Sequence, residues 1–328
     1  MAEIAVIALG GTIAMTSSGA GGVAPTLSAE ELTAAVPGLA DVARIRTSTF
    51  RQLPGAHLGL EDATALAREV RRAAATSDGV VVTQGTDTIE EVAFVLDLLV
   101  GSPRPVVVTG AMRNPQVPGA DGPANLLAAV QTAASPVARD LGCIVVLNDE
   151  IHAARLVVKR HTARPDAFGS PLAGPLGYVA EGRPRVLLRP VAAKADISGD
   201  VIPRSVALVT VVLGDDGTAV RGAAEGNEGI VVEAMGGGHV PIAVADAIGA
   251  VTPTMPVIFA SRTQSGEVLR STYGFPGSEA DLLARGALSA GWLNARKTRV
   301  LLSLLLGDER PAKLPVRLAA YLDVAAGG

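Results

Sequence analysis

The amino-acid sequence predicts a two-domain α/β protein. Its larger N-terminal domain has a doubly wound, mostly parallel sheet, and its smaller C-terminal domain also has a parallel sheet. Short β-branched and apolar runs recur along the chain and are typical of strands buried on both faces. Segments with apolar residues at helical spacing alternate with these runs, as in parallel sheets covered by helices. Residues 184–203 have little periodicity and several breakers. We therefore predict an N-terminal domain over 1–190, a linker over 191–204 and a C-terminal domain over 205–328.

Composition argues against several classes of function. The chain has 328 residues, of which 48% are hydrophobic and 18% charged, and this balance is typical of a globular protein. A net charge of −4 and an aromatic content of 3% argue against nucleic-acid binding and against an anionic membrane as partner. The apolar segment at the N-terminus is too short for a signal peptide or a membrane span, so we expect a cytoplasmic protein.

Cysteine and histidine offer little for metal or redox chemistry. The single cysteine, Cys143, lies in the strand-like run 143–147 and is expected to be a small buried hydrophobe. The four histidines have no pair at metal-ligand spacing; they are His57, His152, His161 and His239. We therefore expect no metal and no cofactor.

The first predicted strand, residues 4–9, ends in Gly10-Gly11-Thr12-Ile13-Ala14. The two glycines allow a sharp turn and a close approach of the backbone to a ligand, and they leave Thr12 at the carboxyl end of the strand. The glycine spacing is wrong for dinucleotide binding. The following segment, 15–27, is rich in Gly and Ser, so it is either a mobile lid or a plain connection.

A second stretch, residues 80–91, changes from a strand pattern to a helix pattern within a few positions. Thr88 and Glu91 have the spacing of a capping box. Gly85, Thr86 and Asp87 should then lie in a tight turn between strand and helix, where ligands of open α/β sheets bind. The alternative is that Thr86 and Asp87 only cap the helix.

The rest of the N-terminal domain continues the alternation. Asp121 is expected to cap a helix. Within residues 154–162, which are interpreted as a strand, Lys159 directly follows the apolar residues. Lys159 is either a surface lysine or a base that deprotonates Thr86. The other expected elements are helices at 29–36, 60–75 and 124–134, a strand at 105–110, and loops at 111–120 and 168–178.

The C-terminal domain repeats the pattern on a smaller scale. The glycine run 236–238 is interpreted as a tight turn rather than a phosphate loop. Asn294 is expected to cap a helix. The expected strands are 206–213, 229–234 and 256–260, and the expected helices are 242–250, 281–289, 295–306 and 316–324.

The motif ending in Thr12 together with Gly85-Thr86-Asp87-Thr88-Ile89-Glu90-Glu91 resembles the bacterial-type L-asparaginase family, and the similarity covers essentially the whole chain. The resemblance implies a larger and a smaller α/β domain. It implies hydrolysis of asparagine, sometimes with glutamine as a side substrate. It also implies a homodimer or homotetramer whose site is shared between the N-terminal domain of one subunit and the C-terminal domain of its neighbour.

Roles follow by position. Thr12 resembles the family's nucleophile, and Thr86, Lys159 and Asp87 resemble its second catalytic group. Asp87 also matches a residue that binds the substrate ammonium. Glu267 resembles the acid that the neighbouring subunit supplies. The remaining substrate-binding positions are Gly11 and Gly85, as N–H donors, and Gly55 and Ala56.

Several positions depart from the family's pattern. Residues 15–27 lack the usual lid tyrosine, Gly55 stands where a serine is usual, and Gln84 replaces a common histidine. An asparagine is also missing near residues 236–239. We therefore expect weaker or shifted substrate binding, with glutamine, D-asparagine or another β-amide as alternative substrates. A catalytically weak binding homologue is a further alternative. A tRNA-dependent amidotransferase subunit is less expected, because it normally carries an extra N-terminal domain.

Overall fold

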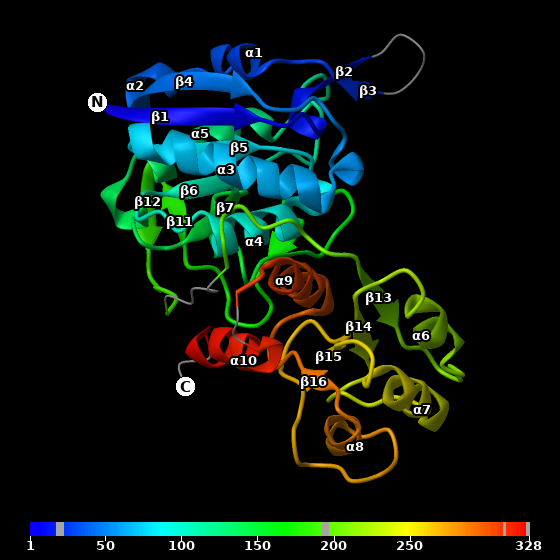
Figure 1. The fold of residues 1–328 in the computed structure, drawn as a ribbon. Coiled ribbons are helices and arrows are strands. Elements are labelled where there is room, and N and C mark those ends of the chain that lie inside the picture. The colour runs from blue at the N-terminus through cyan, green and yellow to red at the C-terminus, as the bar shows by residue number, and fades with distance from the viewer. Residues whose placement is uncertain (18–22, 192–196, 311–312, 326–328) are drawn as a thin grey trace. The chain divides into compact units, whose positions relative to one another are not determined.

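The computed structural model describes residues 1–17, 23–191, 197–310 and 313–325. The chain forms two compact units, Met1–Ala192 and Ala193–Gly328 (Figure 1). Both units combine parallel strands with helices, so the predicted two-domain α/β fold is confirmed.

The first unit is built on an eight-stranded sheet in the order β12-β11-β8-β7-β6-β5-β1-β4. Five neighbouring strands are parallel: β1 (Ala2–Ala8), β4 (Ala43–Thr49), β5 (Gly79–Thr83), β6 (Val106–Thr109) and β7 (Cys143–Leu147). Three strands extend the sheet in antiparallel pairs: β8 (Glu150–Ala153), β11 (Gly177–Ala180) and β12 (Arg183–Val186). The central strands are fully buried, with Val80, Val81 and Val82 at 0% exposure.

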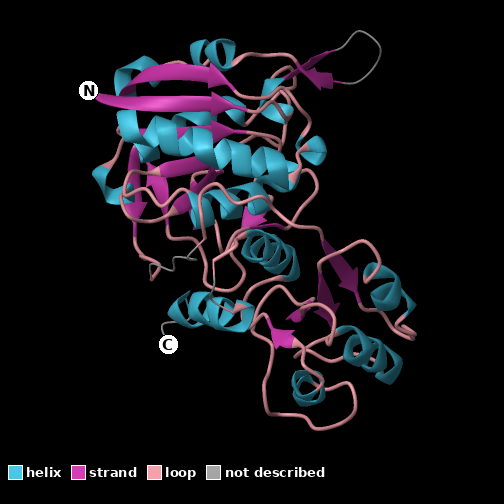
Figure 2. Cartoon of the chain, viewed as in Figure 1, coloured by secondary structure: helices cyan, strands magenta, loops and turns pink. Residues whose placement is uncertain are grey.

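Helices cover both faces of this sheet, which explains why its central strands are apolar throughout (Figure 2). Helices α3 (Leu60–Thr76) and α4 (Ile89–Leu99) pack together on one face. Helix α5 (Gly122–Ala133) packs on the other, with α1 (Ala29–Ala34) and α2 (Leu39–Val42) near β4. Among its described residues, this unit also has four short 3₁₀ turns: Thr12–Ala14, Gly55–His57, Thr86–Thr88 and Pro136–Ala138.

The order of the strands brings the two site-like stretches together. β5 lies between β1 and β6, and all three run parallel, so the loops at their carboxyl ends are neighbours. The Leu9 N–H donates to the Thr83 carbonyl at 2.9 Å, and the Gln84 N–H donates to the Thr109 carbonyl at 3.0 Å. The segments that contain Thr12 and Thr86 therefore leave the same edge of the sheet side by side.

The second unit has a four-stranded parallel sheet in the order β13-β14-β15-β16. Its strands are β13 (Val206–Thr210), β14 (Gly229–Ala234), β15 (Val257–Ser261) and β16 (Leu288–Ser289). Its helices are α6 (Thr218–Ala223), α7 (Ile242–Val251), α8 (Glu279–Ala284), α9 (Ala295–Gly307) and α10 (Leu314–Ala325). Asn294 caps α9 by accepting the Lys297 N–H, as predicted. The glycine run forms a tight turn, also as predicted, closed by a bridge between Met235 and His239.

Several expected elements are wrong. The segment 15–27 contains a hairpin of β2 (Met15–Ser17) and β3 (Val23–Pro25), and its residues 18–22 lie outside the described part of the chain. The predicted loop 168–178 contains β10 (Phe168–Gly169) and the start of β11. The predicted helix 281–289 ends early, because Gly286 has a φ of +90° and the chain continues into β16.

Other strands were missed or overextended. β4 was not predicted, because this edge strand alternates charged and apolar residues and is exposed along one side. β8 and β12 were also missed; each is only four residues long. The run 154–162 is not one strand: residues 154–156 form a turn, and only Val158 and Lys159 form a strand, β9. Cys143 is buried, as expected.

Within the described ranges, none of the helices combines the length and the apolar character that crossing a membrane requires.

One buried carboxylate ties together three segments of the second unit. The Asp308 side chain is 2% exposed and accepts the Ser198 N–H at 2.9 Å. It also pairs with Arg310 and with Arg317 of α10, at 2.7 and 2.8 Å. Burial alone would raise the pKa of Asp308, but the hydrogen bonds from Arg310 and Ser198 outweigh it and lower the pKa from 3.8 to about 2.

We expect Asp308→Asn to lower the free energy of unfolding at pH 7 by roughly 1–2 kcal/mol. The folded-state pKa lies below the unfolded value, so the contribution of Asp308 is complete above about pH 4 and is lost as the pH falls toward 2. The difference in Tm between the two proteins should therefore be constant from pH 7 to about pH 4 and narrow as the pH falls further toward 2. The exposed Asp323, changed to Asn, is the control. A gap that is independent of pH would contradict the explanation.

Candidate active site

Three glycines bring three loops into direct backbone contact at the carboxyl edge of the first unit's sheet. A Cβ on Gly11 would lie 2.1 Å from the Gly85 nitrogen, and a Cβ on Gly85 would lie 2.6 Å from the Gly55 nitrogen. Gly11 also has a φ of +81°, which L side chains rarely adopt. A side chain at Gly11 or Gly85 would overlap the facing backbone, so the contact requires glycine at these two positions, whereas a Cβ on Gly55 would lie 3.0 Å from Gly85 and require only a small shift.

Thr12 follows directly from this contact. It is half-buried and begins a 3₁₀ turn whose next two residues, Ile13 and Ala14, are buried in the core. The Gly11 N–H donates to the Leu53 carbonyl at 3.1 Å. The Gly11 amide is thus engaged within the protein, and the prediction that the turn N–H groups around Gly11 and Gly85 bind a ligand stays a prediction. Gly11 contributes the close approach of the loop, and the turn anchors Thr12 to the core.

Thr86, Asp87 and Lys159 are joined by hydrogen bonds, although 72 residues separate Asp87 from Lys159. The Lys159 Nζ donates to the Thr86 Oγ1 at 2.8 Å and to the Asp87 Oδ1 at 2.7 Å. Thr86 is buried, the Lys159 side chain is 18% exposed, and the Asp87 side chain is 65% exposed. The alternative of a surface lysine does not describe this geometry. The arrangement presents an amine, a hydroxyl and a carboxylate to one another, as a proton relay requires.

Thr88 does not form the predicted capping box, because no side-chain cap bond closes the start of α4. Its hydroxyl donates instead to the Gly55 carbonyl at 3.0 Å. The Gln84 Nε2 donates to the Gly85 carbonyl at 3.3 Å. Both side chains therefore stabilise the glycine contact rather than the helix terminus.

Asp121 has a different function from the predicted helix cap. It stands before α5 without a side-chain cap bond, and its carboxylate accepts the N–H groups of Met112 and Arg113 at 2.9 and 2.8 Å. The buried Asn125 donates to the Gly110 carbonyl at 3.0 Å. These two side chains hold the loop after β6 near Thr86, since a Cβ on Gly110 would lie 3.3 Å from the Thr86 Cγ2.

The sequence interpretation missed the role of Asn125. The only available signal was the four-residue spacing of Asp121 and Asn125, which places both side chains on one side of the first turn of α5.

The remaining predicted positions differ in setting. Gly55 is buried and Ala56 is exposed in the same 3₁₀ turn. A Cβ on Gly55 would lie 3.0 Å from the carbonyl of Gly85, so a serine here would require that carbonyl to shift by a few tenths of an ångström. Glu267 belongs to the second unit, where it is exposed on the segment between β15 and α8. The structure thus joins Thr86, Asp87 and Lys159 by hydrogen bonds and Gly11, Gly55 and Gly85 by backbone contact.

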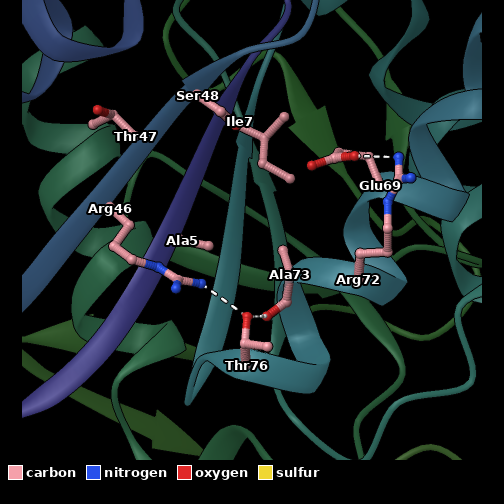
Figure 3. Close-up of a pocket in the computed structure, with 9 residues that line it drawn as sticks. All are labelled: Ala5, Ile7, Arg46, Thr47, Ser48, Glu69, Arg72, Ala73 and Thr76. Carbon is pink, nitrogen blue, oxygen red and sulfur yellow. Dashed lines mark hydrogen bonds and ion pairs between the residues drawn. The ribbon is translucent and has the colours of Figure 1, made fainter.

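A groove on the first unit lies away from the candidate site residues. A groove of about 340 Å³ is lined by β1, β4 and α3 residues, none of them a candidate site residue (Figure 3). Its arginines are already engaged: Arg46 donates to Thr76, and Arg72 pairs with Glu69. The groove is therefore not a free cationic site. Among the described residues, no three His, Cys, Asp or Glu side chains are grouped so that they could hold a metal ion.

Comparisons with known proteins agree for both units. The family model "Asparaginase, N-terminal" matches residues 3–192, and "Glutaminase/Asparaginase C-terminal domain" matches residues 205–314. The chain is 37% identical to a "Probable L-asparaginase" of Deinococcus radiodurans, over 93% of this chain and 92% of the relative. It is 39% identical to a "Glutaminase-asparaginase" of Pseudomonas fluorescens, over 56% and 52%.

A solved structure, "Probable Cytoplasmic L-asparaginase" from Campylobacter jejuni, has a similar fold. It aligns with a TM-score of 0.87 and 32% identity, over 98% of this chain and 99% of that one.

We expect Gly85→Ala to destabilise the first unit, because the added methyl would have to displace the backbone of Gly55, at a cost of roughly 1–3 kcal/mol. Gly222→Ala in α6 is the matched control, since a Cβ there would meet nothing within 4 Å. Thermal unfolding should show a lower Tm for Gly85→Ala alone. Equal Tm values for the two variants would show that the glycine contact is not required.

Proposed function

This chain belongs to the asparaginase family and is a hydrolase that acts on asparagine; from that premise we propose that L-asparagine is its main substrate and a threonine hydroxyl its nucleophile. The products are L-aspartate and ammonia. The observation that carries the proposal is the pair of short bonds from the Lys159 amine to Thr86 and Asp87.

The chemistry needs a nucleophile and a proton relay. A threonine hydroxyl is a weak nucleophile until a base accepts its proton. In the neutral form, the Lys159 amine is placed to accept a proton from the Thr86 hydroxyl at 2.8 Å. The ammonium that results is stabilised by the Asp87 carboxylate at 2.7 Å. This relay works without histidine or metal.

We assign the attack on the amide carbon to Thr12, on its resemblance to the family's nucleophile. The hydroxyl proton passes through the Thr86–Lys159 relay to the amide nitrogen, the C–N bond breaks, and ammonia leaves. Water then hydrolyses the ester, releasing aspartate and restoring the threonine. Asp87, which has the exposed carboxylate of the group, is assigned to the substrate ammonium.

Substrate preference is set by the turn that contains Gly55. A glycine there has no hydroxyl for the substrate carboxylate, and a side chain would press on Gly85. We therefore propose a raised KM for L-asparagine relative to a serine-bearing site. L-Glutamine and D-asparagine are the alternative substrates, and a relative is named glutaminase-asparaginase.

We propose that the enzyme is a homodimer or homotetramer in which Glu267 of one subunit completes the site of another. Glu267 is exposed on the second unit, and Tyr273 and Phe275 on the same segment are each about half exposed, at 45% and 46%. Exposed aromatic side chains beside a polar residue are typical of protein interfaces.

A cytoplasmic location is also proposed, by analogy with the similar solved structure whose protein is called cytoplasmic. Fractionation of the source cells, with the hydrolase assayed in each fraction, tests this location. Activity confined to an extracytoplasmic fraction would overturn it.

Thr12→Ala, Thr86→Val and Lys159→Met should each lower kcat for L-asparagine by roughly 10²-fold or more, because each removes one group of the reaction. Ammonia release is measured for L-asparagine, D-asparagine and L-glutamine over a wide concentration range. Thr64→Val is the matched control, since this buried threonine donates to the Glu61 carbonyl within α3.

Full activity in Thr12→Ala or Thr86→Val would reject the assigned residues. Absence of ammonia from all three amides with the unaltered protein would favour the binding homologue.

Mixing the Thr12→Ala and Glu267→Gln variants, each expected to be inactive alone, should restore part of the activity. In a dimer with two shared sites, reassociated Thr12→Ala and Glu267→Gln subunits form half hybrid dimers, and each hybrid has one intact site. We therefore expect about a quarter of the wild-type activity after mixing. Ammonia release before and after denaturant-assisted exchange measures it. No recovery, with exchange verified by mass spectrometry, would mean that the site is not shared.

A further inference from the structure

The structure contains a buried carboxylate that the proposed reaction does not use. Glu90 lies in the first turn of α4 and is 4% exposed. Its Oε2 accepts the main-chain N–H of Lys159 at 3.0 Å. A carboxylate is costly to bury unless polar groups compensate it. Here one compensating group is the backbone of the residue whose side chain forms the proton relay.

We propose that Glu90 is the positioning residue of Lys159: it fixes the base of the lysine side chain to the first turn of α4, which directly follows the 3₁₀ turn that carries Thr86 and Asp87. The proposal rests on the assignment of Lys159 under the proposed function. It adds a residue that does not touch the substrate but acts through one that is assigned to the reaction.

The strand that contains Lys159 needs such an anchor. β9 has only two residues, Val158 and Lys159, and pairs with β10 in a separate two-stranded sheet rather than with the eight-stranded one. Two-stranded ribbons are marginal by themselves. The ribbon is reinforced internally, because the Arg160 N–H donates to the Ala167 carbonyl at 2.6 Å and the Arg160 side chain donates to the Phe168 carbonyl at 3.2 Å.

The Arg160 guanidinium also lies directly against Gly169, since a Cβ on that glycine would lie 2.3 Å from the Arg160 Cζ. The ribbon that carries Lys159 is therefore bonded within itself by both main-chain and side-chain contacts. Its position depends on its bonds to the rest of the unit, and the bond from the Lys159 N–H to Glu90 is one of these.

Lys159 is consequently held at both ends by residues 86–90. Its main-chain N–H binds Glu90, and its Nζ binds Thr86 and Asp87. The lysine side chain between these ends has several rotatable bonds and considerable conformational entropy. Fixing its base limits the positions that the Nζ can reach, and so keeps the amine within 2.8 Å of the Thr86 hydroxyl.

Selective acylation of lysine tests the proposal without relying on turnover. The chain has four lysines, and Lys313 is exposed and serves as the internal reference. Limiting acetic anhydride followed by peptide mass spectrometry gives the rate at Lys159 relative to Lys313. In Glu90→Leu we expect this ratio to rise by roughly threefold or more, because the released amine spends less time bound to Thr86 and Asp87.

The same variants are assayed for ammonia release. Glu90→Leu should lower kcat by roughly 10-fold or more and change KM less, since the relay rather than substrate binding is disturbed. Glu90→Gln keeps an oxygen acceptor at the same reach and should stay within about threefold of wild type in both kcat and labelling. Glu90→Asp keeps the charge but shortens the reach, and it should fall between them; it also replaces Glu90→Leu if that variant does not fold.

Glu31→Leu is the matched control. Its carboxylate also lies in the first turn of a helix and accepts a main-chain N–H, that of Ser28, at 2.7 Å. It should lower the Tm without changing the Lys159 labelling ratio. A folded Glu90→Leu or Glu90→Asp with the wild-type labelling ratio and the wild-type kcat would overturn the proposal. A changed labelling ratio in a protein that releases no ammonia even as wild type would instead overturn the proposed function and leave the positioning intact.

Discussion

The contact between the backbones of Gly11, Gly55 and Gly85 brings together the loops from which Thr12 and Thr86 extend. The three glycines come from three separate loops, and no other residue type allows the loops to approach so closely. Thr12 and Thr86 follow two of these glycines directly. Thr88 and Gln84 add hydrogen bonds around the same contact. The positions of both threonines thus depend on a contact between backbones, which the side chains of Thr88 and Gln84 stabilise.

Two further carboxylates of the site, those of Asp121 and Glu90, accept hydrogen bonds from the main chain. Asp121 binds two N–H groups of the loop after β6, and Glu90 binds the N–H of Lys159. Bonds to the main chain restrict where a loop can lie, whatever its side chains are. The loops that carry Thr86, Asp87 and Lys159 are thus positioned by main-chain bonds. The two hydrogen bonds of the Lys159 Nζ then complete the relay.

The sequence predicted the central strands well, because they are buried on both faces and consist of continuous β-branched runs such as residues 80–82. The sequence analysis missed or overextended strands whose residue pattern is not that of a buried strand. The edge strand β4 alternates charged and apolar residues, and β9 has only two residues. Thr12, Thr86 and Asp87 could be singled out because glycines mark their turns. Glu90 could not be assigned, since its partner Lys159 is distant in sequence and only the folded chain brings the two together. For Asn125 the spacing from Asp121 was visible, but its bonds with Gly110 and Asn148 form only in the folded chain.

The buried position of Gly55 has a consequence for anyone who wishes to redesign the protein. A side chain added at this position would require the Gly85 carbonyl to shift by a few tenths of an ångström, so it would disturb the loop that carries Thr86. The neighbouring Ala56 and His57 are exposed in the same turn and have room to vary. Libraries aimed at a new selectivity should therefore vary Ala56 and His57 and leave Gly55 unchanged. The exposed side chains can be replaced without disturbing the contact between Gly55 and Gly85.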